Sequence, residues 1–319
     1  MTDGIVIRNT GSLYIVRVCG ADAVSEVPCK VKGNFRIKGL RTTNPVAVGD
    51  CVRIAEPGPD GVAFITEVLP RRNYIIRRST NLSKATHIIA ANIDCALLVV
   101  SLAHPTTSLT FIDRFLATAE AYSVPAMLAI NKIDLLGEPE DMELLEAVKA
   151  LYESLGYPSI GVSAHTGEGL DELREALCGK TTLFSGNSGV GKTSLINALV
   201  PGLDLRTGQI SEAHDTGMHT TTFSEMFDLP GGGAIIDTPG IRGFGTVEFG
   251  REEVGHYFPE IFRLSTDCRF GNCTHTHEPG CAVLEALAEH RIAESRYNSY
   301  LSILEETEDG ASDKYRKPY

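Results

Sequence analysis

The 319-residue sequence has no run that approaches the roughly 20 consecutive apolar residues of a membrane-spanning helix. Its first ten residues, MTDGIVIRNT, lack the basic segment and apolar stretch of a secretory signal. Eight cysteines are too few for a disulfide scaffold in a chain of this length. With 43% hydrophobic and 22% charged residues, wholesale disorder is also excluded. We therefore expect a folded, cytoplasmic protein with no membrane partner.

Basic residues are scarce overall, and the formal net charge of −12 argues against a chain that coats nucleic acid along its whole length. The charge is unevenly distributed. Residues 1–80 contain 12 Lys/Arg and 7 Asp/Glu, whereas the remaining 239 residues contain 17 and 34. Any nucleic-acid contact is therefore expected near the N-terminus. The candidate phosphate contacts, for which a solvated basic surface is the alternative, are Arg36, Lys38, Arg41, Arg71 and Arg72.

Residues 1–72 are predicted to form a small closed β-barrel of the OB type. Five short β-prone segments are separated by turn signals such as Gly49-Asp50. They are Ile5–Ile7, Tyr14–Val18, Val46–Val48, Cys51–Ile54 and Ala63–Ile65. The basic excess favours an RNA-binding barrel, although a barrel that binds protein, or nothing, shows the same pattern.

Residues 80–245 show the alternation of an α/β domain. The apolar runs 95–101 and 125–130 are typical of strands buried on both faces of a parallel sheet. Further strands are expected at 159–162, 182–184 and 234–236, a hairpin over 223–236, and helices at 111–122, 139–155 and 169–177. The pattern predicts a doubly wound sheet. Residues 246–319 then predict a helical domain, with one helix over 282–306.

A phosphate-binding loop is predicted at Gly186-Asn187-Ser188-Gly189-Val190-Gly191-Lys192-Thr193, which matches G-x-x-x-x-G-K-[ST] between an expected strand and a helix that Ser194 opens. Backbone N–H groups and the helix N-terminus would bind phosphate, and Lys192 would reach the β- and γ-phosphates. The Thr193 hydroxyl would coordinate Mg²⁺. A chance glycine-rich turn is the alternative. At the end of a later strand, the motif Asp237-Thr238-Pro239-Gly240 supplies a second magnesium ligand, Asp237, and the Gly240 N–H to sense the γ-phosphate.

A guanine site is predicted at Asn131-Lys132-Ile133-Asp134. The Asp134 carboxylate can accept both guanine donors, N1–H and N2–H₂, whereas adenine N1 would meet it with a lone pair. Asn131 can bond another base edge, and the Lys132 stem can lie along the ring. After a further strand, Ser163-Ala164 places a backbone N–H near the guanine oxygen. Together with the phosphate motifs, these residues favour GTP over ATP.

A metal site is predicted where the cysteines gather, at Cys268-x₄-Cys273-x-His275-x₅-Cys281. Three thiols and one imidazole suit tetrahedral Zn²⁺, and four protein ligands make the site structural. His277 is an alternative to His275, and buried free cysteines or a redox pair are alternatives to a metal.

The order of the motifs is unusual, because the base motif precedes the phosphate loop. Conventional GTPases have the opposite order, so the domain is circularly permuted. With the barrel ahead, the cysteine cluster behind and Gly217-Met218-His219-Thr220-Thr221-Thr222 between the phosphate motifs, the chain resembles the ribosome-small-subunit-dependent GTPase A family over roughly residues 1–305. The resemblance implies barrel, permuted GTPase and zinc-binding domains. It also implies GTP hydrolysis stimulated by the 30S subunit, binding to 16S rRNA, a role in late 30S maturation, zinc ligation by His275, and Mg²⁺ ligation by Thr221.

The catalytic residue does not follow the usual GTPase motif. Many GTPases place a glutamine after the D-x-x-G glycine to orient water, and here Ile241 stands there. His219 is the candidate that replaces it, with an inert loop histidine as the alternative. Arg242 could stabilise the transition state or form a structural ion pair.

Other functions remain open on these residues. They are an RNA-binding placement module that holds GTP with little hydrolysis, a GTPase acting on tRNA, and an ATPase or kinase, against which Asp134 argues. We expect a monomer. Because Gly240 leads directly into the C-terminal domain, the nucleotide state could also move that domain as a unit.

Overall fold

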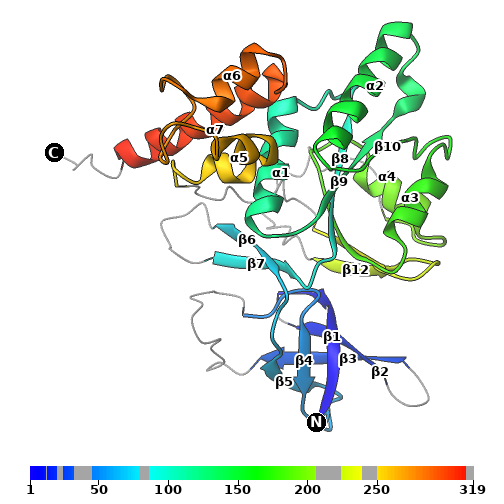
Figure 1. Ribbon diagram of the computed structural model, residues 1–319. Coiled ribbons are helices and arrows are strands. Elements are labelled where there is room, and N and C mark those ends of the chain that lie inside the picture. The colour runs from blue at the N-terminus through cyan, green and yellow to red at the C-terminus, as the bar shows by residue number, and fades with distance from the viewer. Residues whose placement is uncertain are drawn as a thin grey trace.

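The computed structural model describes residues 1–11, 13–19, 24–31, 45–78, 86–205, 224–238 and 250–313. The chain forms an N-terminal barrel, a central α/β part and a C-terminal group of helices (Figure 1). None of the helices within these ranges has the length and apolar character needed to cross a membrane.

The N-terminal barrel has five strands: β1 (Thr2–Asn9), β2 (Tyr14–Cys19), β3 (Val24–Val31), β4 (Cys51–Ile54) and β5 (Ala63–Val68). They pair in the order β1-β2-β3-β5-β4, and β4 pairs back onto β1. The inward positions alternate along each strand and fill the barrel with side chains such as Val6, Val16 and Ile65. The predicted closed barrel is confirmed.

One predicted barrel strand is wrong and another was missed. Residues 46–48 do not form a strand. They lead into a turn at Gly49, in which Asp50 Oδ2 accepts the Ala47 N–H at 2.8 Å, and Val48 makes only an isolated bridge to Ala90. The fifth strand is β3. The segment contains Pro28, which cannot donate to a ladder. Even so, β3 lies between β2 and β5 and buries Cys29 completely.

The central sheet contains β8 (Cys95–Ser101), β9 (Ala126–Asn131), β10 (Ser159–Val162), β11 (Thr181–Ser185), β12 (Glu225–Asp228) and β13 (Ala234–Asp237). The order is β10-β9-β8-β11-β13-β12, and all pairs are parallel except the β12–β13 hairpin. The doubly wound sheet and its hairpin therefore agree with the predictions. A separate hairpin, β6 (Tyr74–Arg78) and β7 (Thr86–Ala91), was not predicted.

Helices cover both faces of this sheet: α1 (Leu109–Ala121), α2 (Pro139–Ser154), α3 (Leu170–Leu177) and α4 (Lys192–Leu199). Alternate side chains of β8 enter two different cores. Leu98 and Val100 pack with α1 and α2, whereas Leu97 and Val99 pack with α3 and α4. This two-sided burial explains why β8 is a continuous apolar run.

The barrel and the sheet are joined edge to edge. β1 pairs with β12 as well as with β2 and β4, with Arg8 opposite Glu225, so one eleven-stranded sheet runs through both parts. Figure 1 shows β12 directly above the barrel.

The C-terminal part contains the 3₁₀ turn η3 (Val254–Tyr257) and the helices α5 (Pro259–Ser265), α6 (Ala282–Ala288) and α7 (Glu294–Asp313). The single helix predicted over 282–306 is therefore wrong. His290 has a φ of 58°, and the Arg291 N–H bonds the Ala286 carbonyl at 2.8 Å. This left-handed capping geometry ends α6, and a new helix starts at Glu294.

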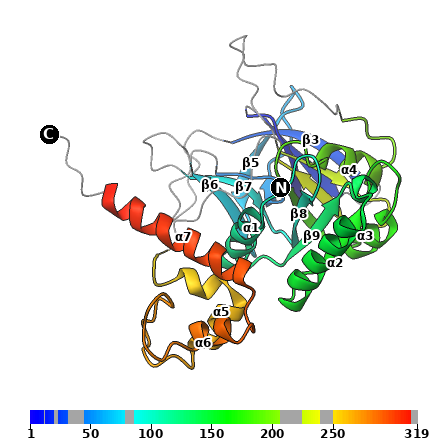
Figure 2. The same ribbon diagram turned by 90° about the horizontal axis from the view of Figure 1, so that it is seen from above.

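Helix α1 also belongs to the C-terminal core. It lies between the sheet and α7 (Figure 2), and its Ala117 packs with Phe258 and Tyr300. At this junction the buried Arg296 guanidinium donates to Asp113 Oδ1 at 2.8 Å and to Glu260 Oε1 at 2.7 Å. A unit movement of this domain would have to carry α1 or break these bonds.

Arg296→Ala is expected to lower the free energy of unfolding by about 3–5 kcal/mol, because it leaves two buried carboxylates without a counter-charge. Arg114→Gln is the matched control. It removes an ion pair between the same two helices, Arg114–Glu306, but that pair is exposed and should contribute less than about 1 kcal/mol. Denaturant unfolding of both variants tests this. Equal losses would show that the buried bonds of Arg296 to Asp113 and Glu260 stabilise the fold no more than the exposed pair does.

Candidate nucleotide and metal sites

The predicted nucleotide motifs gather at one edge of the sheet. They follow the carboxyl ends of β9, β10, β11 and β13, which run parallel and so end together. Ligands of open α/β sheets bind outside these strand ends, where backbone groups and helix N-termini are free to receive them.

The phosphate loop needs its glycines for physical reasons that the structure makes visible. Gly186 has a φ of 145°, and a Cβ there would lie 2.3 Å from the Val99 carbonyl oxygen. Gly191 has a φ of 92°, and a Cβ there would lie 2.3 Å from Asn131 Nδ2. The Lys192 ammonium donates to the carbonyls of Gly186 and Asn187 at 2.6 and 2.9 Å, which folds the lysine back over the loop.

Asn131 connects three of the motifs. Its Nδ2 donates to the Val190 carbonyl at 2.8 Å, and its Oδ1 accepts the Ala164 N–H at 3.1 Å. The residue is 3% exposed. Asn131 therefore holds the phosphate loop against the base motif, a role that its position in the sequence did not reveal. Each of its polar atoms keeps capacity for one further hydrogen bond.

Asp134 is exposed at the mouth of the site, and a buried serine orients it. Ser163 Oγ donates to Asp134 Oδ1 at 2.5 Å and accepts the backbone N–H groups of His165 and Thr166 at 3.2 and 3.0 Å. Because both N–H groups occupy the serine oxygen, its proton is directed at Asp134. Lys132 adopts a φ of 68°, and its ammonium donates to the His104 carbonyl.

Lys192 and Asp237 place opposite charges beside the phosphate loop. Burial lowers the pKa of Lys192, and the Asp237 carboxylate opposes the shift. Burial raises the pKa of Asp237, Lys192 and the Thr238 N–H oppose it, and Glu225 adds to it. The hydroxyl of Thr193, in the first turn of α4, and the Asp237 carboxylate are hard oxygen donors of the kind that Mg²⁺ prefers. The residues present therefore fit a magnesium ion.

Several predicted site residues lie outside the described residues: Gly217, His219, Thr220, Thr221, Thr222, Gly240, Ile241 and Arg242 in the nucleotide site, and Arg36, Lys38 and Arg41 in the barrel. Of the two remaining arginines, Arg71 does not fit the predicted role as a phosphate contact. Its side chain is 8% exposed and pairs with the fully buried Asp50 at 2.6 Å. Arg72 is 62% exposed and lies against Asp94.

The four predicted zinc ligands come together, with all ligand atoms within 4.8 Å of one another. Cys268 Sγ lies 3.9 Å from Cys281 Sγ, and His275 Nδ1 lies 3.6 and 3.4 Å from these two sulfurs. Tetrahedral Zn²⁺, with bonds of about 2.3 Å to sulfur and 2.0 Å to nitrogen, requires edges of about 3.8 and 3.5 Å. The donor set therefore fits zinc. His277 lies outside this cluster, and its Nδ1 bonds Thr276.

The ligand loop is held by groups that the sequence pattern did not identify. Glu278 accepts the N–H groups of Thr274 and Thr276 at 2.7 and 3.0 Å. Partial burial opposes ionisation of Glu278, but the hydrogen bonds from Thr274 and the backbone lower its pKa. Tyr297 and Tyr300 of α7 donate to the carbonyls of His275 and Thr274, both at 2.7 Å. These bonds fix the ligand loop to α7.

Burial sets the protonation of the ligands in the absence of a metal. It raises the pKa of the Cys273 thiol to about 12 and raises that of Cys281. It also lowers the pKa of His275, which Glu278 opposes. Without a metal, the Cys273 and Cys281 thiols would hold their protons at neutral pH, so a bound ion must displace those protons.

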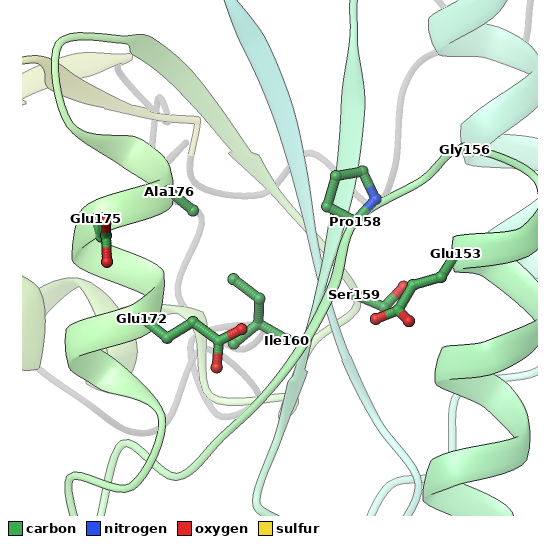
Figure 3. Close-up of a pocket in the computed structure, with 8 residues that line it drawn as sticks. All are labelled: Glu153, Gly156, Pro158, Ser159, Ile160, Glu172, Glu175 and Ala176. Atoms are coloured by element: carbon green, nitrogen blue, oxygen red, sulfur yellow. The ribbon is translucent and has the colours of Figure 1, made fainter.

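A hollow of about 580 Å³ lies elsewhere on the α/β part. Figure 3 shows it between α2 and α3 at the amino end of β10, with Glu153, Glu172 and Glu175 around it and Ile160 at its base. The nucleotide motifs lie at the opposite, carboxyl ends of the strands, so this hollow is separate from them.

The sheet, the gathered motifs and their order define a circularly permuted P-loop GTPase, an enzyme that hydrolyses GTP. The family description "RsgA GTPase" matches residues 68–247, and "RsgA N-terminal domain" matches residues 3–62. The chain belongs to the RsgA GTPase family.

Its relatives match over their full lengths. The chain is 59% identical to the small ribosomal subunit biogenesis GTPase RsgA of Bacteroides fragilis over 316 residues, covering 99% of each chain. It is 60% identical to that of Porphyromonas gingivalis over 321 residues, covering 99% of this chain and all of the relative. Among solved structures, YjeQ from Thermotoga maritima matches with a TM-score of 0.76 and 34% identity, covering 96% of this chain and 98% of its own. YloQ, described as a circularly permuted GTPase, matches with a TM-score of 0.75 and 28% identity, covering 100% and 97%.

Proposed function

We propose that this GTPase acts on the small ribosomal subunit as a late-stage 30S maturation factor. The observation that carries the proposal is the gathering of base motif, phosphate loop and Asp237 at one sheet edge, in a chain whose full-length relatives are named small ribosomal subunit biogenesis GTPases. The barrel is proposed to bind 16S rRNA. The protein would work in the cytoplasm as a monomer, with domains at 1–72, 80–245 and 246–319.

Co-sedimentation with 30S and 50S subunits tests the partner. We expect binding to 30S alone, and tighter binding with a non-hydrolysable GTP analogue than with GDP. Phosphate release with and without 30S subunits separates a hydrolase from a placement module that merely holds GTP. Equal binding to both subunits, or no stimulation of hydrolysis by 30S, would contradict the proposal.

For the nucleotide site we propose that Asp134 reads guanine, supported by Asn131, Lys132, Ser163 and the Ala164 N–H. The phosphates would lie on residues 186–194, with the Gly240 N–H against the γ-phosphate. Mg²⁺ would be held by Thr193, Thr221 and Asp237, where it would neutralise the developing phosphate charge. The zinc of the Cys268, Cys273, His275 and Cys281 site would be structural, one per chain.

Asp134→Asn is expected to shift preference from guanine toward xanthine nucleotides. The substituted amide can donate to the 2-oxo group of xanthine and no longer accepts two guanine donors. Ser163 Oγ can still donate to the amide oxygen, so the orientation should persist. Competition between GTP and XTP measures the change. A variant that still prefers GTP would show that the base is read elsewhere.

A further inference from the structure

Strand β12 lies between the first strand of the barrel and the strand that carries Asp237. β12 pairs with β1 on one side and with β13 on the other, both antiparallel. In these registers Glu225 lies opposite Arg8 and also opposite Asp237. Directly opposed residues of antiparallel strands share a face of the sheet, so the three side chains form one row across three strands.

Along this row the charge is positive at Arg8 and negative at both Glu225 and Asp237. Arg8 Nε donates to Glu225 Oε1 at 2.6 Å, and a second guanidinium nitrogen contacts the same oxygen. Two carboxylates placed directly opposite each other, as Glu225 and Asp237 are, repel one another. Lys192 is the positive group on the other side of Asp237. Within the described residues, Arg8 therefore supplies the charge that faces Glu225 from the barrel.

We propose that Arg8 is a positioning residue of the nucleotide site, because it neutralises Glu225, so that Asp237 is the carboxylate of this row that remains to face Mg²⁺ and the phosphates. The barrel thereby takes part in nucleotide binding without touching the nucleotide. This inference rests on the proposed function, which assigns Asp237 to the metal.

The local charge determines the direction of the effect. In the wild type, the net charge of residues 8 and 225 is zero. It becomes −1 in Arg8→Gln and +1 in Glu225→Gln, and it returns to zero in the double variant. A negative charge in the row that contains Asp237, partly screened by water, should weaken binding about threefold. GTP should lose more than GDP, because it carries more negative charge, and bound Mg²⁺ should reduce the loss.

A second ion pair offers a matched control. Arg17 of β2 donates to Asp228 at 2.6 Å, which again joins the barrel to β12. Asp228 lies opposite Ala234, at the other end of the hairpin from Asp237. Arg17→Gln therefore removes a comparable link between the same two parts, with no carboxylate opposite it on β13.

Fluorescent derivatives of GDP and of a non-hydrolysable GTP analogue would measure affinity for the full-length variants, with and without Mg²⁺, at low and high salt. We expect Arg8→Gln to bind the GTP analogue about threefold more weakly at low salt without Mg²⁺, Glu225→Gln to bind it more tightly, and the double variant to match the wild type. High salt should remove these differences, and Arg17→Gln should stay close to the wild type.

Equal effects of Arg8→Gln and Arg17→Gln, or a double variant that stays weak, would overturn the inference, because both outcomes indicate a loss of structure. Thermal unfolding of each variant identifies such a loss independently. Failure of the wild type to prefer guanine nucleotides would instead overturn the proposed function, and the comparison between variants is not affected by that result.

Discussion

Protein purified without added zinc is expected to contain one equivalent of the metal, and its removal should unfold the C-terminal part. Structural zinc sites contribute on the order of 10 kcal/mol to folding. Here all four ligands lie in the segment between α5 and α6, which contains turns but no helix or strand. Without the ion, one buried thiol, two half-buried thiols and one imidazole would have to stay together with weak hydrogen bonds alone.

Hydrogen exchange before and after chelation is the measurement. Protection should fall over residues 250–313 and persist in β8, β9 and β11, whose cores lie in the α/β part. Cys273→Ser should reproduce the loss. Cys178→Ser is the control, because Cys178 is exposed and its thiol only donates to the Gly231 carbonyl at 2.9 Å. Full protection over residues 250–313 in a metal-free protein would show that zinc is not needed to fold the C-terminal part.

The central sheet could be predicted because its sequence signals come from residues that are close together in the chain. β8 and β9 are buried on both faces, so each reads as an unbroken apolar run, and the helices between the strands have the 3.6-residue period. The hairpin β12–β13 was predicted from the glycines that join its strands. Such features depend on a few neighbouring residues and need no knowledge of the rest of the chain.

The remaining elements depend on distant partners. β3 is stabilised by β2 and β5 on either side, which overrides the penalty of Pro28. Arg71 looked like a surface charge because its partner, Asp50, is 21 residues away and fully buried. The Asp113–Arg296 bond joins residues 183 positions apart. No short sequence window contains both members of these pairs.

The site divides in the same way. The spacing of the glycines and cysteines in each motif follows from short loops, so the phosphate loop and the zinc ligands were predictable. The choice of His275 over His277 came from resemblance, and the clustering of the four ligands agrees with it. The bridging role of Asn131 was not predictable, because it depends on β9, β10 and the phosphate loop ending at the same edge.

The second prediction with a large expected effect concerns the GTP hydrolysis step. With Ile241 in the position where many GTPases have a water-orienting glutamine, hydrolysis by the free protein should be slow, and the 30S subunit should accelerate it by placing His219 beside the attacking water. His219→Ala should retain GTP affinity and 30S binding but lose about 10²–10⁴-fold of the stimulated rate, because a proton-transfer or water-positioning group acts mainly in the transition state.

Single-turnover hydrolysis on saturating 30S subunits separates this effect from binding. His277→Ala serves as the control, since this exposed histidine lies beside the zinc ligands and should leave the rate unchanged. Affinity for a non-hydrolysable GTP analogue should be equal in both variants, because the phosphate loop with its Lys192, and Asp134, remain intact. If His219→Ala lost less than about threefold in rate, the group that orients water would have to come from the ribosome. The subunit would then stimulate hydrolysis by completing the active site itself rather than by placing His219.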